Sequence, residues 1–154
     1  MATRRHDQEQ PADAIAMLKA DHQRVKDLFA HYEATGNKET KWTIAEEVFV
    51  ELETHAQLEE QVFYPAVADQ ADKKGQELVQ ESLGDHQTVK HLMQELRDMG
   101  PQVLGFDAKF KELIHNVAHH VEEEETQMFP LAEQQLADDM EEFMEEMQEL
   151  KEEM

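Results

Sequence analysis

The sequence predicts an all-α protein built as a single domain. Three observations carry this prediction: glycine and proline are scarce, with 5 and 4 in 154 residues, strong helix formers such as Glu, Gln, Leu and Met are frequent, and the chain repeats itself once. Strands and tight turns depend on residue types that are rare here, whereas the frequent types have high helix propensity. This length suits one domain with its own hydrophobic core.

The repeat consists of two segments that each occur twice. DHQRVKDL at 21–28 returns as DHQTVKHL at 85–92, identical at six of eight positions and offset by 64 residues. HAQLEEQVFYP at 55–65 returns as HVEEEETQMFP at 120–130, offset by 65 residues. The pattern indicates a duplicated helix pair. Two copies with so long a period favour a closed four-helix bundle over an open stack of repeats.

Helix-breaking residues place the elements of the first copy. Pro11 suits the first turn of a helix over about 13–34, which ends before the turn-like TGN at 35–37. A second helix is expected over about 39–71. Pro65, near its end, either kinks or terminates it, because proline lacks the N–H that the helix needs.

The second copy has the same layout and is followed by an acidic tail. A third helix covers about 75–99 and stops at Gly100 and Pro101, and a fourth runs from about Asp107 past Pro130. Residues 138–154 hold nine acidic residues and one lysine, with apolar residues at helical spacing. We therefore predict a disordered arm at 1–11, a four-helix bundle at 12–136 and an acidic amphipathic C-terminal helix at 137–154.

Charge and composition exclude several classes of function. The net charge of −22 repels phosphate backbones and anionic lipid, so we expect neither nucleic acid nor membrane as a partner. The absence of cysteine removes disulfides, thiolate metal sites and cysteine nucleophiles. No signal peptide or membrane span is evident in the sequence. We expect a cytoplasmic protein.

Each predicted bundle helix has a row of core-facing positions spaced alternately by three and four residues. Every row contains one histidine, and the second and fourth rows add a glutamate one turn later, on the same face. The rows are Ile15, Leu18, His22, Val25, Phe29 and Tyr32; Val48, Leu52, His55, Glu59, Val62 and Ala66; Val79, Leu83, His86, Val89, Met93 and Leu96; and Phe106, Phe110, Leu113, Val117, His120, Glu124, Met128 and Leu131.

This set of residues predicts a metal site. Burying an unpaired carboxylate costs several kcal/mol, so Glu59 and Glu124 need cations, and no core-facing position carries Lys or Arg. Imidazole and carboxylate ligands suit iron, manganese or zinc. Six ligands are too many for one tetrahedral zinc, so two bridged metals, preferably irons, fit better. The order His-x-x-x-Glu reverses the Glu-x-x-His of ferritin-like bundles and disfavours that class.

The order His22, His55-x-x-x-Glu59, His86, His120-x-x-x-Glu124 resembles the hemerythrin-like, or HHE cation-binding, family. The resemblance covers about 12–136 and implies an up-down-up-down four-helix bundle with a non-haem di-iron centre. It also implies that the two glutamates bridge the irons, together with an oxo or hydroxo group. The metal ligands implied are His22, His55, Glu59, His86, His120 and Glu124.

One departure from the family bears on function. Oxygen-carrying hemerythrins have a second histidine four residues after the third-helix histidine, and here that position is Lys90. Water, a tyrosine or another carboxylate could complete the coordination instead. We therefore expect a reaction with hydrogen peroxide, oxygen or nitric oxide, as a di-iron peroxidase, a catalase-like enzyme or a nitric-oxide-detoxifying oxidoreductase. Sensing, binding or storage of iron, oxygen or nitric oxide without turnover is the alternative.

Other residues have simpler interpretations. For Glu60 and Glu125, which follow the predicted ligands, we favour a solvated helix face over contact with the site, and Lys26 and Lys90 are interpreted as surface lysines. Tyr32 is expected to pack in the core. The C-terminal helix is expected to lie on the bundle, with docking of a protein partner or a second copy as the alternative. Four further histidines are expected at the surface, namely His31, His91, His115 and His119.

Overall fold

The computed structural model describes residues 13–154. This part of the chain is helical apart from short connections, and it contains no strand. No helix within these residues combines the length and the apolar character needed to cross a lipid bilayer. The elements are α2 (Ala14–Ala34), α3 (Lys38–Leu58), η1 (Glu59–Phe63), α4 (Tyr64–Gln70), α5 (Lys73–Met99), α6 (Phe106–Glu123), η2 (Glu124–Met128), α7 (Phe129–Gln135), η3 (Ala137–Asp139) and α8 (Met140–Glu153).

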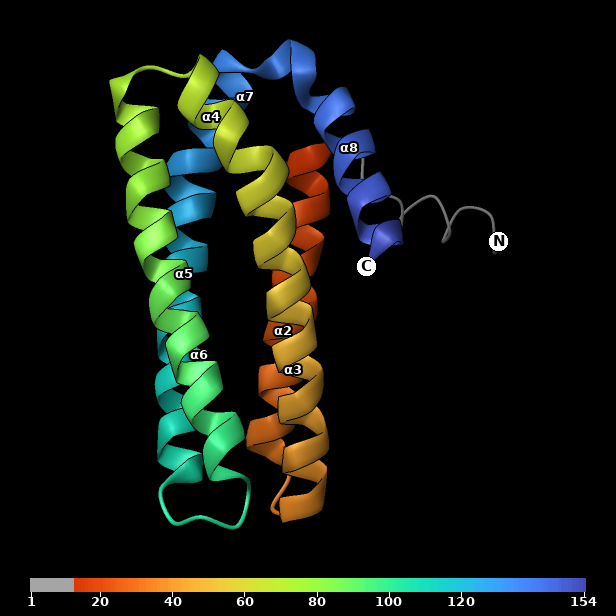
Figure 1. Ribbon diagram of the computed structural model, residues 1–154, viewed down its shortest axis with the longest axis vertical. Coiled ribbons are helices and arrows are strands. Elements are labelled where there is room, and N and C mark those ends of the chain that lie inside the picture. Colours follow the sequence, from red (N-terminus) through yellow and green to blue (C-terminus); the bar gives the residue numbers. More distant parts are fainter. Residues whose placement is uncertain (1–12) are drawn as a thin grey trace.

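The helices form an antiparallel four-helix bundle, which confirms the predicted fold class. In Figure 1, α2 runs down the molecule, α3 with α4 runs up, α5 runs down, and α6 with α7 runs up. The acidic helix α8 then descends beside α2, as expected for a short fifth helix on the bundle. The arm predicted at 1–11 lies outside the described residues.

Local capping explains where the helices begin and end. Asp13, Asn37 and Asp72 each accept a hydrogen bond from a backbone N–H in the first turn of the helix that follows, at 2.9–3.1 Å. The loop between α5 and α6 is bounded by Gly100 and Gly105, which have φ angles of 75° and 97°. Glycine adopts this left-handed backbone region at little cost, which allows the sharp turn.

The second and fourth bundle helices each contain one wide turn. η1 and η2 are π-helical, and the N–H groups of Tyr64 and Phe129 bond to the carbonyls of Glu59 and Glu124, five residues back. Both turns lie just before a proline at the start of α4 or α7. Because proline has no N–H to donate, the preceding turn has a free carbonyl and widens. Pro65 therefore does not terminate the helix, which continues to Gln70.

The wide turn moves the core-facing row by one residue. The regular spacing predicts Val62 and Ala66 in the core, but both are only half-buried. Phe63, Tyr64 and Val67 are buried instead, with at most 1% of each exposed. The prediction was wrong beyond Glu59 because it assumed an uninterrupted α-helix. In the second copy Met128 is buried as predicted, but Phe129 is buried as well, and Ala132 lies in the core where Leu131 was predicted.

The hydrophobic core has two parts, and the predicted ligands lie between them. One part, at the α4 and α7 end, includes Leu18 and Phe63, and α8 covers it with Phe143 and other residues. The other part, toward the α5–α6 loop, includes Phe49 and Phe110. The apolar face of α8, made of Met140, Phe143 and Met147, is thus covered by the bundle.

Candidate metal centre

The structure brings together the six predicted ligands, one histidine from each bundle helix and the two glutamates that begin the wide turns. None of the six is more than 8% exposed. They form two groups in which one possible ligand atom of each residue lies within 4.8 Å of the others. Glu59 and Glu124 belong to both groups.

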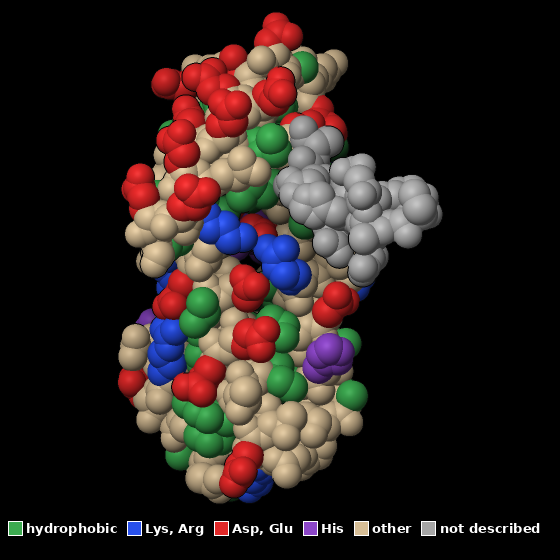
Figure 2. All heavy atoms as spheres, turned by 90° about the vertical axis from the view of Figure 1, so that its right-hand side faces the viewer, with side chains coloured by type: hydrophobic (Ala, Val, Ile, Leu, Met, Phe, Trp, Pro, Cys, Tyr) green, Lys and Arg blue, Asp and Glu red, His purple; other side chains and the backbone are tan. Residues whose placement is uncertain are grey.

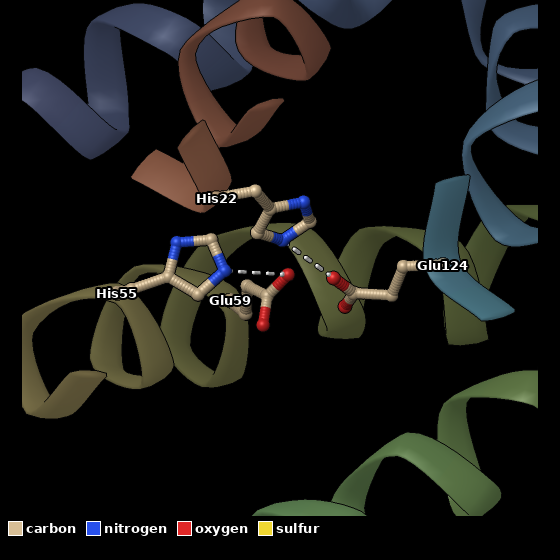
Figure 3. A group of neighbouring side chains, drawn as sticks. All are labelled: His22, His55, Glu59 and Glu124. Carbon is tan, nitrogen blue, oxygen red and sulfur yellow. Dashed lines mark ion pairs between the residues drawn. The ribbon is translucent and has the colours of Figure 1, made fainter. Parts of the chain in front are cut away.

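The first group consists of His22, His55, Glu59 and Glu124, whose polar atoms converge on one point (Figure 3). His22 Nε2 lies 3.1 Å from Glu124 Oε1, and His55 Nε2 lies 3.3 Å from Glu59 Oε2. These four buried atoms lack a hydrogen-bond partner among the described residues. Each unsatisfied buried polar atom costs about 1–3 kcal/mol, so the group is incomplete without a further binding partner. A metal cation would satisfy all four atoms together.

The second group uses the other carboxylate oxygens. Glu59 Oε1 lies 3.0 Å from His86 Nε2, and Glu124 Oε2 lies 3.4 Å from His120 Nε2. Each glutamate therefore directs one oxygen to each group. This is the arrangement that a carboxylate needs in order to bridge two cations, and the donor set of imidazoles and carboxylates suits iron. The residues present fit such a centre.

Tyr64 is a residue of the site that the sequence analysis did not identify. Its hydroxyl lies 3.0 Å from Glu59 Oε1, 3.2 Å from His86 Nε2 and 3.3 Å from His120 Nε2, and it donates a hydrogen bond to Glu124. Burial, followed by the two carboxylates, raises the pKa of Tyr64 well above its ordinary value. The wide turn before Pro65 is what points this side chain inward. The internal repeat did not point to Tyr64 as a site residue, because the corresponding position in the second copy is Phe129, which has no hydroxyl.

Glu60 and Glu125 contact the site, so their interpretation as a solvated helix face was wrong. Glu60 lies 2.6 Å from His86 Nδ1, and Glu125 lies 2.8 Å from His22 Nδ1. A carboxylate that accepts the Nδ1 proton leaves Nε2 unprotonated and fixes the ring, which orients the imidazole toward a metal. The wide turns also place these residues, since each directly follows the first residue of η1 or η2.

Asp21 and Asp85 orient the other two imidazoles and were also missed. Asp21 lies 2.9 Å from His55 Nδ1, and Asp85 lies 3.1 Å from His120 Nδ1. Both belong to the repeated DHQ segment, so the first helix of each pair supplies one histidine and also the carboxylate that holds the histidine of the second helix. The signal was therefore present in the sequence as a repeated Asp-His pair.

Neighbouring charges shift the pKa values of the histidines and glutamates in the centre. Burial lowers the pKa of His55, but Glu59 and Asp21 outweigh it and raise the pKa to about 10. Burial likewise lowers the pKa of His120, while Glu124 and Glu59 raise it to about 11. Burial raises the pKa of Glu59, whereas the charge of His55 and further hydrogen bonds hold it well below its ordinary value. The metal-free centre thus holds protons where a metal would bind.

The remaining sequence expectations concern residues around the centre. Lys90, at the position of the absent histidine, directs its Nζ to Glu60 Oε1 at 3.1 Å. It therefore supports the carboxylate that holds His86. Tyr32 packs in the core with 1% exposed, as predicted, and bonds to Asp107 at 3.0 Å. The four histidines expected at the surface are exposed, namely His31, His91, His115 and His119.

A small cavity adjoins the centre. Its volume is about 40 Å³, and it is lined by all four site histidines and by apolar side chains that include Val25, Val89, Met93 and Val117. Because one water needs about 10–15 Å³ on this scale, the cavity has room for a molecule of two heavy atoms. A branched organic molecule does not fit.

Comparison with known proteins places the chain in a family. Residues 13–132 match the model of the hemerythrin HHE cation binding domain. The chain belongs to this family. The crystal structure of an HHE cation binding domain-containing protein from Mycobacterium kansasii has the same fold, with a TM-score of 0.78 at 23% identity over 92% of this chain and 86% of that one.

Two curated proteins are similar in sequence to this HHE domain. An uncharacterized hemerythrin-like protein of Schizosaccharomyces pombe is 24% identical over 119 residues, which are 77% of this chain and 59% of that protein. A protein of Nostoc sp. named DNA nickase is 25% identical over 113 residues, which are 73% of this chain and 31% of that protein. The chain thus spans less than two thirds of the length of either relative.

Proposed function

We propose that this HHE domain is a non-haem di-iron protein that reacts with a small oxidant, namely hydrogen peroxide, oxygen or nitric oxide. The observation that carries the proposal is that Glu59 and Glu124 each direct one carboxylate oxygen to the first group of histidines and the other oxygen to the second group. His22 and His55 would hold one iron and His86 and His120 the other, with the glutamates shared. When bound, the two irons would supply the electrons and the Lewis acidity for the reaction.

The residues around this centre support a reaction with a small molecule. The cavity of about 40 Å³ beside the histidines admits peroxide or a diatomic gas and keeps out larger molecules. A carboxylate lies within hydrogen-bond distance of the Nδ1 of each of the four histidines. Each ring is thus held with its Nε2 toward the centre, where a metal would replace any proton on that nitrogen. Holding the rings in this way reduces rearrangement when the metals change charge.

We assign Tyr64 to the His86–His120 side of the centre as an oxygen ligand. Its hydroxyl is within 3.3 Å of atoms from Glu59, His86 and His120, where a metal held by these residues would lie. It thus supplies a donor that Lys90 cannot, since the lysine is occupied with Glu60. On binding, the phenol would lose its proton to the solvent, which would free the Glu124 oxygen that now accepts its hydrogen bond.

Tyr64→Phe tests this assignment by spectroscopy. A ferric ion bound to phenolate absorbs visible light by charge transfer, so the variant is expected to lose the visible band and keep the near-ultraviolet absorption of the iron pair. Iron content should stay near that of the wild type, because six ligands remain. Tyr32, a buried tyrosine whose hydroxyl bonds to Asp107 away from the centre, provides the control: Tyr32→Phe should leave the visible band intact. Equal visible spectra in all three proteins would refute ligation by Tyr64.

The proposed function is tested by loading the protein with iron and offering each oxidant in turn. Two irons per chain are expected. After anaerobic reduction, repeated turnover of peroxide, oxygen or nitric oxide with an external reductant supports an enzyme. Reversible binding at one molecule per centre instead supports a sensor or carrier and contradicts the enzymatic proposal. Protein that takes up no metal would contradict both.

A further inference from the structure

A wide groove runs between α2 and α6 and reaches the metal centre from outside. Its volume is about 570 Å³, and Phe29, Ile114 and Glu33 are among the residues that line it. The groove and the small cavity share part of their lining, which is formed by His22, Val25, Val117 and Val121. The side chains of these four residues therefore separate the open groove from the small cavity beside the metal centre.

The opposite side of the bundle, between α3 and α5, is bridged by ion pairs, and two of their residues, Glu53 and Lys90, also line the small cavity. Arg97 on α5 forms a two-pronged ion pair with Glu53 on α3, with Nη1–Oε2 and Nη2–Oε1 distances of 2.7 and 3.0 Å. Lys90 on α5 also pairs with Glu60 at the start of η1. We call the Arg97–Glu53 pair the latch. Paired charges in this planar geometry are the more stable kind of surface ion pair.

The internal repeat shows why the α2–α6 side lacks a latch. The offsets of 64 and 65 residues relate Arg97 to Glu33 and Glu53 to Ala118. The position of the basic residue holds an acidic one, and the position of its acidic partner holds alanine, which cannot form an ion pair. Glu33 and Ala118 both line the groove and are exposed. The two sides of the bundle carry similar metal ligands, but only the α3–α5 side has the Arg–Glu ion pair on its outer face.

The shared wall indicates which molecules can cross it. Val25 and Val117 are 4% and 6% exposed, and an apolar wall of this kind does not stabilise a charged molecule in transit. The net charge of −22 further disfavours the approach of anions. The cavity behind the wall, at about 40 Å³, excludes bulky oxidants. A small uncharged oxidant satisfies all three conditions.

We propose that the substrate is a small uncharged oxidant that enters through the α2–α6 groove, past Val25, Val117 and Val121, because this side of the bundle has no counterpart of the latch. The inference rests on the proposed function, since it concerns the oxidant of the same centre. It assigns the two sides of the bundle different roles: α3–α5 is closed by ion pairs, and α2–α6 is the entrance.

Transplanting the latch tests the route. In Glu33→Arg/Ala118→Glu, the α2–α6 side receives the pair that closes α3–α5, and both substituted positions are exposed, so folding should be unaffected. Association of nitric oxide with the ferrous protein, followed by stopped flow, is expected to slow about two- to fivefold, as fits a surface ion pair that must open. The single variants Glu33→Arg and Ala118→Glu are the controls and should bind nitric oxide at the wild-type rate.

Val121→Phe narrows the same wall without an ion pair and is expected to slow nitric oxide association as well. Arg97→Ala is the control on the other side: it removes the latch without touching the lining of the cavity or of the groove, and it should leave the rate unchanged. Unchanged association in both the double variant and Val121→Phe overturns the proposal. So does faster association in Arg97→Ala alone, because entry would then use α3–α5.

A metal-free measurement separates this inference from the proposed function. Dissolved oxygen is paramagnetic and broadens the NMR signals of methyl groups along its path. In metal-free protein the methyl groups of Val117 and Val121, which line both the groove and the cavity, should broaden more than those of their repeat counterparts, Leu52 and Ala56, which line the cavity alone. Equal broadening on the two sides contradicts the route even if the loaded protein reacts, whereas a protein that binds no iron but shows unequal broadening fails only the proposed function.

Discussion

Glu59→Ala is expected to cause the largest loss of metal of any single substitution, and to do so on both sides of the centre. Glu59 is fully buried and directs one oxygen toward His55 and the other toward His86. Removing a residue that only orients a ligand already costs about 10- to 100-fold in metal affinity. Removing a shared ligand should cost more than about 100-fold and leave less than one iron per chain.

His22→Ala provides the graded comparison, since His22 belongs to the first group alone. It should lower the iron content by about half, because one of the two sites keeps its ligands. His31→Ala and His91→Ala change exposed histidines away from the centre and should leave iron near the wild-type amount. Iron content is measured after dialysis against a weak chelator. Equal iron in Glu59→Ala and His31→Ala would refute the assignment of Glu59.

Metal binding is expected to weaken steeply as the pH falls. In the metal-free protein the pKa values of His55 and His120 are raised to about 10 and about 11, so both rings are protonated at neutral pH. A metal must displace both protons, and each displaced proton changes the apparent affinity about tenfold per pH unit. Between pH 6 and 8 the affinity should therefore rise about 100-fold per unit, with about two protons released per loaded chain.

The stability of the metal-free protein should vary with pH in the opposite direction over the same range. Groups whose folded-state pKa is raised contribute stability fully below the unfolded value, about 6.5 for histidine, and lose it as the pH rises toward the folded value. For His55 and His120 the loss runs from about pH 6.5 to 10 or 11. Glu59, whose pKa is lowered, contributes stability at pH values above its ordinary pKa. This contribution is lost as the pH falls from the ordinary pKa toward the lowered one.

Two measurements check this pH dependence. Thermal unfolding of the metal-free protein should be most resistant at about pH 5–6, while the gain on loading with iron should grow from pH 6 to 8. Proton release is read from a weakly buffered titration with a pH indicator. A stabilisation by metal that stays constant across this range, with no protons released, would show that the histidines are not the groups displaced.

Much of the molecule could be predicted from the sequence because its pattern is local and repeated. The histidines and glutamates occur at steps that keep them on one face of a helix, and four such faces can be buried together only in a bundle. The repeat indicated that the two helix pairs contribute equally to the site, since each copy supplies two of the four histidines and one of the two glutamates. The acidic helix at the end could be predicted from the spacing of Met140, Phe143 and Met147.

Other features could not be predicted, because they depend on departures from regular geometry or on contacts between helices. Tyr64 enters the centre only because the turn before Pro65 widens, and helical spacing assigned that side of the chain to Val62. Glu60 and Glu125 occupy positions that a regular helix directs to solvent. Asp21 was visible as a repeated neighbour of histidine, but its partner, His55, lies on another helix.

The sequence by itself determined the fold class, the order of the helices and the set of residues gathered in the core, since these follow from periodicity and from the cost of burying charge. The tertiary structure decided which atoms face one another: that each glutamate serves both groups, that Tyr64 lies among them, and that one side of the bundle is latched while the other is open. These depend on distances between helices, which spacing along one chain does not fix.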